Sequence, residues 1–237
     1  MKRALLDEVV AARAARRPVV RLCWLDGGGE ALIDPAVLER TDDVAAIAGA
    51  GSLDAAIRTA VAESVTSDRA RLVDGPQGPV FVHPFNPPLR LAIVGAVHIA
   101  QRLASLARDL GYEVLVIDPR RGFLTQARFP GVRLDHGWPD EALERFAPDA
   151  RSAVVTLSHD AKIDEPALGV ALRTPCFYVG ALGSRRTQER RRERLRDAGL
   201  DESTLGRIHG PVGLDLGAKS PAEIALSIAA EMTAILR

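Results

Sequence analysis

The amino-acid sequence predicts an α/β protein: a Rossmann-type, mostly parallel, doubly wound sheet that follows a smaller N-terminal α+β domain. The first observation is that residues 89–118, LRLAIVGAVHIAQRLASLARDLGYEVLVID, follow the order strand, glycine turn, helix, glycine stop, strand. The second is that apolar runs alternate with helical patterns through the rest of the C-terminal half. The third is the run PFNPP at 84–88, which excludes a helix and predicts a linker between domains at 1–84 and 89–237.

The N-terminal domain is predicted from short elements that mix helices with antiparallel strands. Asp34 before Pro35 is typical of a helix start, and Ser52 is the predicted cap of a second helix. Period-two alternation on either side of glycine-rich turns predicts strands joined as hairpins. The predicted elements are a helix at 3–16, strands at 20–24 and 31–33, the two capped helices, and a hairpin of 71–73 with 80–82.

The βαβ unit at 89–118 begins the C-terminal domain. Residues 91–94 are continuously apolar, as in a strand buried on both faces, and apolar residues then recur at helical spacing up to Gly111. A second apolar run ends at Asp118, about twenty residues beyond Gly95, where Rossmann domains hold a ribose hydroxyl. Further predicted elements are a strand at 132–134, a helix at 139–146, strands at 153–157 and 176–179, an Arg- and Glu-rich helix to 198, and a final helix opened by the capping box Ser220-Pro221-Ala222-Glu223.

The composition limits the classes of function. Lys plus Arg and Asp plus Glu each number 31 in 237 residues, so zero net charge gives no indication of nucleic-acid binding. No apolar stretch is long enough to span a membrane and no signal peptide is recognisable, which predicts a cytoplasmic protein. Cys23 and Cys176 are too few for a disulfide framework and lack metal-ligand spacing, so no metal site is predicted.

The glycine turn of the βαβ unit departs from the dinucleotide fingerprint G-x-G-x-x-G. It reads Gly95-Ala96-Val97-His98-Ile99-Ala100, so a β-branched side chain stands where the second glycine lets a pyrophosphate approach the backbone. Two interpretations stay open. Either the domain binds a nucleotide at this turn, or it is a Rossmann scaffold that binds no dinucleotide in the usual pose.

In a doubly wound sheet the ligand crevice lies beyond the carboxyl ends of the strands, and the candidate residues gather there. Asp118 is predicted to accept hydrogen bonds from a ribose; the alternative is a carboxylate held by Arg120 or Arg121. Those two arginines are equally compatible with contact to a 2′-phosphate or with simple exposure to solvent. Ser184, at a predicted helix start, precedes two arginines and suits a phosphate, whereas the arginines at 190–196 are predicted to pair with glutamates at turn spacing. The predicted cofactor-binding residues are Gly95, Ala96, Val97, His98, Asp118, Arg120, His159, Asp160, Gly180, Gly183, Ser184, Arg185 and Arg186.

No catalytic residue is assigned. His159 and Asp160 are adjacent on an extended chain and point apart, so they are predicted to line the loop rather than act as a base and its orienting partner. His209 is equally compatible with a structural role.

Three long segments resemble the XdhC/CoxI family of accessory proteins for molybdenum hydroxylases. They are SHDAKIDEPAL at 158–168, YVGALGSRRTQERRRERL at 178–195 and RIHGPVGLDLGAKSPAEIALSI at 207–228, reinforced by PPLRLAIVGAVHIA. The resemblance implies a Rossmann domain behind a smaller domain, and a protein that binds, protects or sulfurates the molybdenum cofactor. Family members carry a GAGHVG turn and an SGGCVE-like loop; here residues 49–54 are the nearest match to that loop, with Ser52 in place of its cysteine. Serine cannot carry persulfide sulfur, so sulfur is expected to come from another protein.

The resemblance and the residues together predict an accessory factor, similar to a divergent CoxF-like member, that assists active-site assembly in xanthine dehydrogenase or carbon monoxide dehydrogenase. Its ligand is expected to be a nucleotide (ADP, NAD(P) or a cytidine nucleotide) or the molybdenum cofactor. Its expected partners are the hydroxylase apoenzyme and a sulfur-donating protein, and a homodimer is left open. The alternatives are an NAD(P)-dependent oxidoreductase of Rossmann type and a nucleotide-regulated binding protein.

Overall fold

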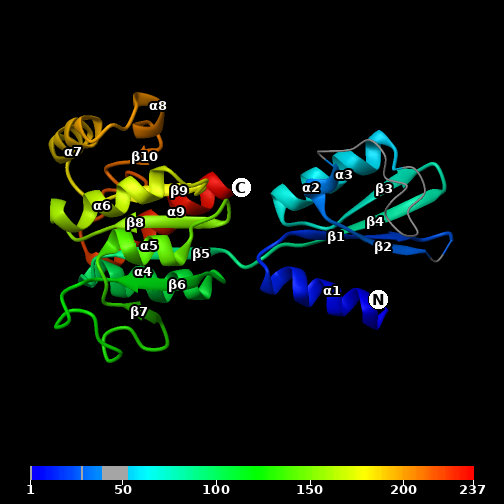
Figure 1. Ribbon diagram of the computed structural model, residues 1–237, viewed down its shortest axis with the longest axis horizontal. Helices are drawn as coiled ribbons and strands as arrows, with labels where there is room; N and C mark the ends of the chain where they lie inside the picture. The colour runs from blue at the N-terminus through cyan, green and yellow to red at the C-terminus, as the bar shows by residue number, and fades with distance from the viewer. Residues whose placement is uncertain (1, 28, 39–52) are drawn as a thin grey trace. The chain divides into compact units, whose positions relative to one another are not determined.

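The computed structural model describes residues 2–27, 29–38 and 53–237 (Figure 1). The chain divides into two compact units, Met1–Pro87 and Pro88–Arg237. The first contains an antiparallel sheet and the second a parallel sheet covered by helices on both faces, which confirms the predicted α/β class.

The N-terminal unit is a four-stranded antiparallel sheet in the order β2-β1-β4-β3. The apolar face of β1 packs under α3 through Val20 and Leu22, together with Ile57 of the helix. The opposite face is covered by α1, whose Val9 and Ala12 pack on Val19. The elements are α1 (Arg3–Ala14), β1 (Val19–Trp24), β2 (Glu30–Ile33), α2 (Pro35–Leu38), α3 (Ala55–Ser67), β3 (Arg71–Gly75) and β4 (Gly78–Phe85).

Two details of this unit correct the sequence predictions. The cap of α3 is Asp54, whose side chain accepts a hydrogen bond from the Ile57 N–H, so the cap is not Ser52. Ser52 lies outside the described residues. The predicted linker begins too early, because β4 continues to Phe85 and Pro84 pairs with Val20 of β1. Proline is tolerated there because β3 pairs with β4 only as far as residue 82, which leaves this end of β4 with a single neighbour.

The C-terminal unit is a six-stranded parallel sheet in the order β10-β9-β8-β5-β6-β7. Counted from the first strand of this unit, the order is 3-2-1-4-5-6 read from β7, the Rossmann arrangement. Its elements are β5 (Arg90–Val94), α4 (His98–Asp109), β6 (Glu113–Ile117), β7 (Arg133–Asp135), α5 (Pro139–Phe146), β8 (Ser152–Thr156), α6 (Ala161–Leu172), β9 (Tyr178–Ala181), α7 (Arg185–Asp197), α8 (Glu202–Leu205), β10 (Ile208–His209) and α9 (Pro221–Leu236).

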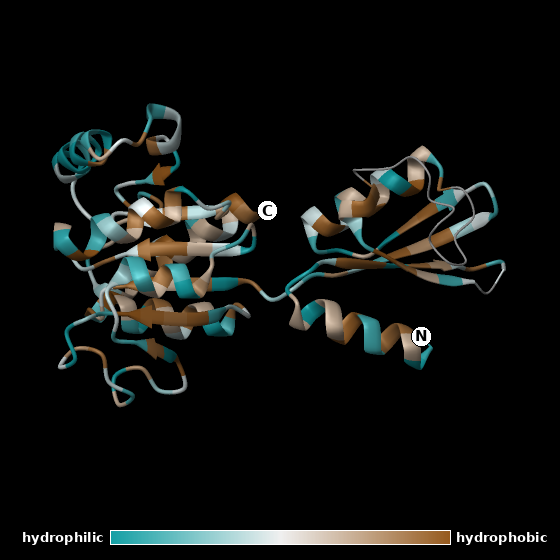
Figure 2. Cartoon of the chain, viewed as in Figure 1, coloured by the Kyte–Doolittle hydropathy of each residue, from teal (hydrophilic) through white to brown (hydrophobic). Residues whose placement is uncertain are grey.

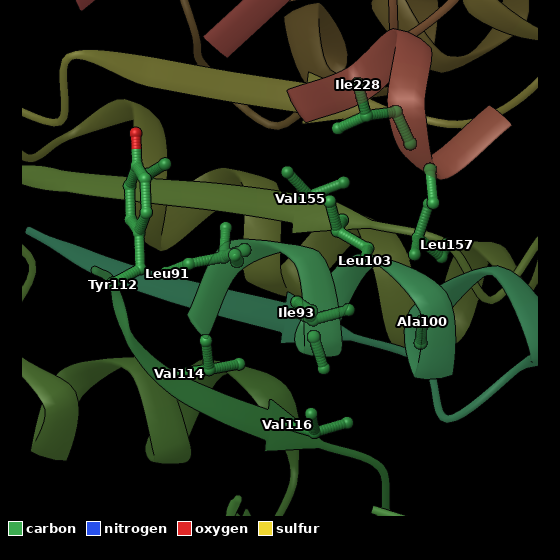
Figure 3. Close-up of a cluster of buried hydrophobic side chains, with 14 of the residues drawn as sticks. Leu91, Ile93, Ala100, Leu103, Tyr112, Val114, Val116, Val155, Leu157 and Ile228 are labelled. Carbon is green, nitrogen blue, oxygen red and sulfur yellow. The ribbon is translucent and has the colours of Figure 1, made fainter. Parts of the chain in front are cut away.

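The sheet is buried on both faces by different helices. On one face, Leu91 and Ile93 of β5 pack with Leu103 of α4 and Ile228 of α9 (Figure 3). On the other face, Ala92 and Val94 of β5 pack against α5 and α6. The inner strands are accordingly apolar over most of their residues, whereas α7 is hydrophilic over most of its length (Figure 2). Alternate residues of each strand thus serve opposite layers, which is why these strands are continuously apolar in sequence.

Several elements of this unit refine the sequence prediction. The helix α6, the short helix α8 and the strand β10 were not assigned from the sequence. The strand predicted at 176–179 is Tyr178–Ala181, so Gly180 lies within β9. The capping box at Ser220 is confirmed, with the Ser220 hydroxyl accepting from the Glu223 N–H and the Glu223 carboxylate accepting from the Ser220 N–H.

Candidate functional site

The carboxyl ends of β5 and β8 form the topological switch point of the sheet. These two strands are neighbours, and the chain leaves them toward opposite sides of the sheet. Gly95 follows β5 with a positive φ of 102°, and a Cβ placed there would lie 2.7 Å from the backbone nitrogen of Ser158. Only glycine permits this approach, so Gly95 is required by the packing of the two chain segments that follow β5 and β8.

The turn after Gly95 is shaped by the backbone and by Asp118. Ala96 is fully buried, and its N–H donates to Asp118 Oδ2 at 2.7 Å. Val97 is half-buried, caps α4 in an extended conformation, and supplies no side-chain hydrogen bond to the helix. His98 is exposed as the first residue of α4. The α4 N-terminus at this turn therefore has no side-chain cap, and helix N-termini favour anions.

The structure shows which groups hold the Asp118 carboxylate. Its side chain is 0% exposed and forms a bidentate pair with Arg120, Nε to Oδ1 at 2.9 Å and Nη2 to Oδ2 at 2.8 Å. The Arg120 N–H also donates to Oδ1. Burial by itself would raise the pKa of Asp118, but the hydrogen bonds from Arg120 and Ala96 outweigh it and hold that pKa below its usual value. The alternative considered from the sequence, a carboxylate held by Arg120, is therefore the arrangement in the structure, and binding of ribose by Asp118 stays a prediction.

Arg120, which follows β6, pairs with Asp118 and is also influenced by the charges of residues that follow β8. Its guanidinium lies over the ring of Phe123, 4.9 Å from the centroid. The hydrogen bonds to Asp118 raise the pKa of Arg120, and the nearby carboxylates of Asp160 and Asp164 raise it further. Arg120 therefore lies within the electrostatic field of groups from both sides of the switch point.

A buried polar network supports the segment that follows β8. Asp164 of α6 is fully buried, accepts from the Ser158 hydroxyl at 2.6 Å, and lies 3.5 Å from Arg191 Nη2. Arg191 also donates to Gln188 Oε1 and to the Leu182 carbonyl. This network ties the β8–α6 turn to the β9–α7 loop, so both loops at the crevice are held by one set of hydrogen bonds.

The sequence predicted that the arginines at 190–196 pair with glutamates at turn spacing on their own exposed helix, and for three of them this prediction is wrong. Arg191 is 3% exposed, and Arg194 pairs with Glu165 of α6 rather than with a glutamate of its own helix. Arg196 pairs with Glu202 of the next helix. Leu195 could have indicated which arginine is buried. It is the lone aliphatic residue of α7, and Arg191, four positions earlier, lies on the same face of the helix.

Burial dominates the protonation of the Asp164–Arg191 pair. Loss of water raises the pKa of Asp164, although the Ser158 hydrogen bonds and the Arg191 charge oppose the change. Loss of water likewise lowers the pKa of Arg191, against the charge of Asp164. Each member is therefore needed to balance the charge of the other at the base of the loops, and removal of either one is expected to be costly.

The other predicted residues near β8 have local roles. His159 adopts the left-handed conformation at φ 63° and is exposed. Asp160 caps α6 by accepting from the Lys162 N–H at 3.0 Å.

The residues predicted around the β9–α7 loop fall into two groups. Gly180 is a packing residue, because a Cβ there would lie 2.6 Å from Val212. Gly183, with φ 139°, leads into Ser184, which caps α7 by accepting from the Thr187 N–H. Arg185 and Arg186 are exposed beside this cap, and no ion pair of either is present in the part of the chain that the structure describes. The structure therefore presents a capped helix start and two solvent-facing guanidinium groups at the same edge as the α4 turn.

A second polar cluster, centred on the buried Tyr178, was not predicted. The Tyr178 hydroxyl donates to Glu231 Oε2, which also accepts from the Gly213 N–H at 2.8 Å. The His209 ring stacks on Tyr178 with centroids 4.7 Å apart, and its Nδ1 lies 3.5 Å from Glu231 Oε1. Burial and the Glu231 carboxylate raise the pKa of Tyr178. The cluster anchors the loop after β10 on α9, which is a structural role for His209.

Two further features bear on function: clusters of metal-ligating side chains and helices that could span a membrane. Among the described residues, no three His, Cys, Asp or Glu side chains come together as metal ligands. Within residues 2–27, 29–38 and 53–237, no helix has the length and apolar character needed to cross a bilayer.

Several known proteins are similar to this chain. Residues 91–232 match the XdhC Rossmann domain. The chain is 32% identical over 154 residues to a protein of Bacillus subtilis (strain 168) named as a probable xanthine dehydrogenase subunit, covering 65% of this chain and 44% of that protein. It is 32% identical over 151 residues to the molybdenum cofactor insertion chaperone PaoD of Escherichia coli (strain K12), covering 64% and 41%. The match thus spans less than half of each of these relatives.

The fold of the whole chain also has a solved counterpart. The crystal structure of a xanthine dehydrogenase from Bacillus halodurans superimposes on 99% of this chain and 67% of its own, with a TM-score of 0.74 and 24% identity. At that identity the likeness establishes the fold, and it includes the N-terminal unit that the domain match leaves out.

Proposed function

Because the chain belongs to the XdhC family, we propose that it is an accessory factor that holds a nucleotide, or the dinucleotide form of the molybdenum cofactor, during assembly of a molybdenum hydroxylase. The ligand is cargo in this proposal. The observation that carries it is that a helix N-terminus without a side-chain cap and exposed arginines lie at the carboxyl edge of one parallel sheet.

The chemistry of these groups fits a phosphate-bearing ligand. The first N–H groups of α4 and α7 point out of the carboxyl edge, and helix N-termini favour negative charge. Arg120, Arg185 and Arg186 add guanidinium groups whose fork of donors matches phosphate oxygens. Val97 narrows the approach to the backbone at the α4 turn, so the ligand is expected to bind with its phosphates displaced from the usual dinucleotide pose.

Sulfur for the metal centre is expected to come from another protein. Burial raises the pKa of the Cys176 thiol, which disfavours the thiolate that would carry a persulfide. The family's cysteine position, Ser52 in this chain, lies outside the described residues.

The test is genetic and chemical. In the native host the gene is deleted, and the hydroxylase is purified and analysed for molybdenum, pterin nucleotide, labile sulfur and activity. We expect an assembled but inactive enzyme with an incomplete metal centre. The deletion is then complemented with wild type, with Arg185→Glu/Arg186→Glu, and with the control Arg3→Glu/Arg69→Glu, which makes the same charge change at exposed arginines of the other unit.

Rescue by wild type and by the control, but not by the crevice variant, supports the proposal. A fully active hydroxylase with a complete metal centre in the deletion strain contradicts it. Equal rescue by all three proteins would place the binding function away from the α7 edge.

A further inference from the structure

The carboxylate of Asp118 has no acceptor position left for a ligand. An ionised carboxylate offers about four lone-pair positions. Oδ1 accepts from Arg120 N and Arg120 Nε, both at 2.9 Å. Oδ2 accepts from Ala96 N at 2.7 Å and from Arg120 Nη2 at 2.8 Å. A ribose diol at this point would have to displace the Arg120 guanidinium from a fully buried acid.

The group that a ligand meets at the end of β6 is therefore Arg120. Its side chain is 37% exposed, one face of the guanidinium is covered by Phe123, and no hydrogen bond from its Nη1 occurs among the described residues. Arg128 lies over the same ring at 5.9 Å, and Arg121 is exposed on the same loop. Residues 119–132 contain three arginines and no acidic residue.

We propose that the crevice selects a ligand with a phosphate group at the ribose position next to β6, and that Arg120 is the residue that sets this selectivity. The inference rests on the proposed nucleotide binding and names the class of ligand within it. In Rossmann domains an acidic residue here receives the ribose 2′-hydroxyl, whereas an arginine nearby receives a 2′-phosphate. In this chain both residues are present, and the arginine covers the acid.

The selectivity follows from whether a ligand must break the hydrogen bonds between Asp118 and Arg120 before it can bind. A phosphate accepts from the outer edge of Arg120 while the pair with Asp118 stays intact. A neutral ribose gains hydrogen bonds to Asp118 only after the bidentate pair opens, which leaves a guanidinium without its partner. The pair therefore favours the charged ligand and disfavours the neutral one at the same position.

Calorimetry with two nucleotides that differ by one group tests this selectivity. The probes are 2′,5′-ADP and 5′-AMP, titrated into wild type, Arg120→Ala and the control Arg121→Ala. We expect wild type and the control to bind 2′,5′-ADP about 10- to 100-fold more tightly than 5′-AMP, the gain expected of charge-assisted hydrogen bonds. Arg120→Ala should lose that preference and bind 5′-AMP more tightly than wild type does, because Asp118 is uncovered.

A second variant guards against misfolding. If circular dichroism shows that Arg120→Ala is unfolded, Arg120→Lys replaces it. Lysine keeps the charge but cannot make the bidentate pair, so the preference should narrow and 5′-AMP binding should still improve.

The outcomes separate this inference from the proposed function. Equal affinity of wild type for both nucleotides, or equal loss of preference in Arg121→Ala, overturns the selectivity and leaves nucleotide binding intact. Binding of 5′-AMP that appears only when Arg120 is replaced supports the covering role of Arg120. Absence of binding in every protein overturns nucleotide binding at the crevice and the selectivity with it.

Discussion

Gly95 allows the packing at the switch point to be tested with a single methyl group. A Cβ at this position would lie 2.7 Å from the Ser158 nitrogen and 2.9 Å from its Cα. Because both atoms belong to backbone, no rotamer change can relieve the contact. We expect about 1–2 kcal/mol from an L-residue at positive φ and about 1–3 kcal/mol from overpacking. Gly95→Ala should therefore lower the free energy of unfolding by about 2–5 kcal/mol.

Gly111→Ala is the matched control, since Gly111 also has a positive φ, 85°, but no described heavy atom beyond its neighbours lies within 4 Å of the Cβ position. It should cost only the backbone part, about 1–2 kcal/mol. Urea unfolding by circular dichroism measures both variants. Hydrogen exchange in peptides from β5 and β8 reports the parallel-sheet unit specifically. If Gly95→Ala is no less stable than Gly111→Ala, the close approach of the two segments is refuted.

Three further predictions concern buried polar groups. Arg191→Ala should lower the free energy of unfolding by about 3–5 kcal/mol, because it leaves the buried carboxylate of Asp164 without its ion-pair partner. Arg190→Ala, on the exposed side of α7, should change it by about 0.5 kcal/mol or less. Equal urea midpoints for the two variants would contradict this prediction. Tyr178→Phe should lower the free energy of unfolding by about 1.5–3 kcal/mol, because it removes a hydrogen bond to the Glu231 carboxylate. Tyr112→Phe should be neutral or stabilising, because the buried Tyr112 hydroxyl has no hydrogen-bond partner among the described residues. The melting temperatures of the two variants test which is the less stable. The pKa of Asp118 is lower in the folded protein than in the unfolded chain, so its contribution to stability is present above pH about 4 and is lost as the pH falls through the lower folded pKa. Asp118→Asn should therefore reduce the dependence of the unfolding free energy on pH in acid. An unchanged dependence would refute the pairing of Asp118 with Arg120.

The sequence by itself determined the features that depend on neighbours along the chain. The βαβ unit, its glycine turn and its terminal acid, Asp118, follow from apolar periodicity and spacing. The capping box at Ser220 follows from a four-residue pattern. Each of these follows from periodicity or spacing along one continuous stretch of chain, so no knowledge of the rest of the fold is needed to predict it.

Tertiary structure decided which of those residues are available. No spacing rule distinguishes a free Asp118 from one closed by Arg120, because the choice depends on burial under the Ala96 turn. The partner of Arg191 belongs to α6, and pairing rules within α7 could not identify it. Tyr178 and Glu231 are 53 positions apart and meet only because α9 covers β9. Long-range packing sets burial, and burial determines whether a charged side chain serves the fold or faces a ligand.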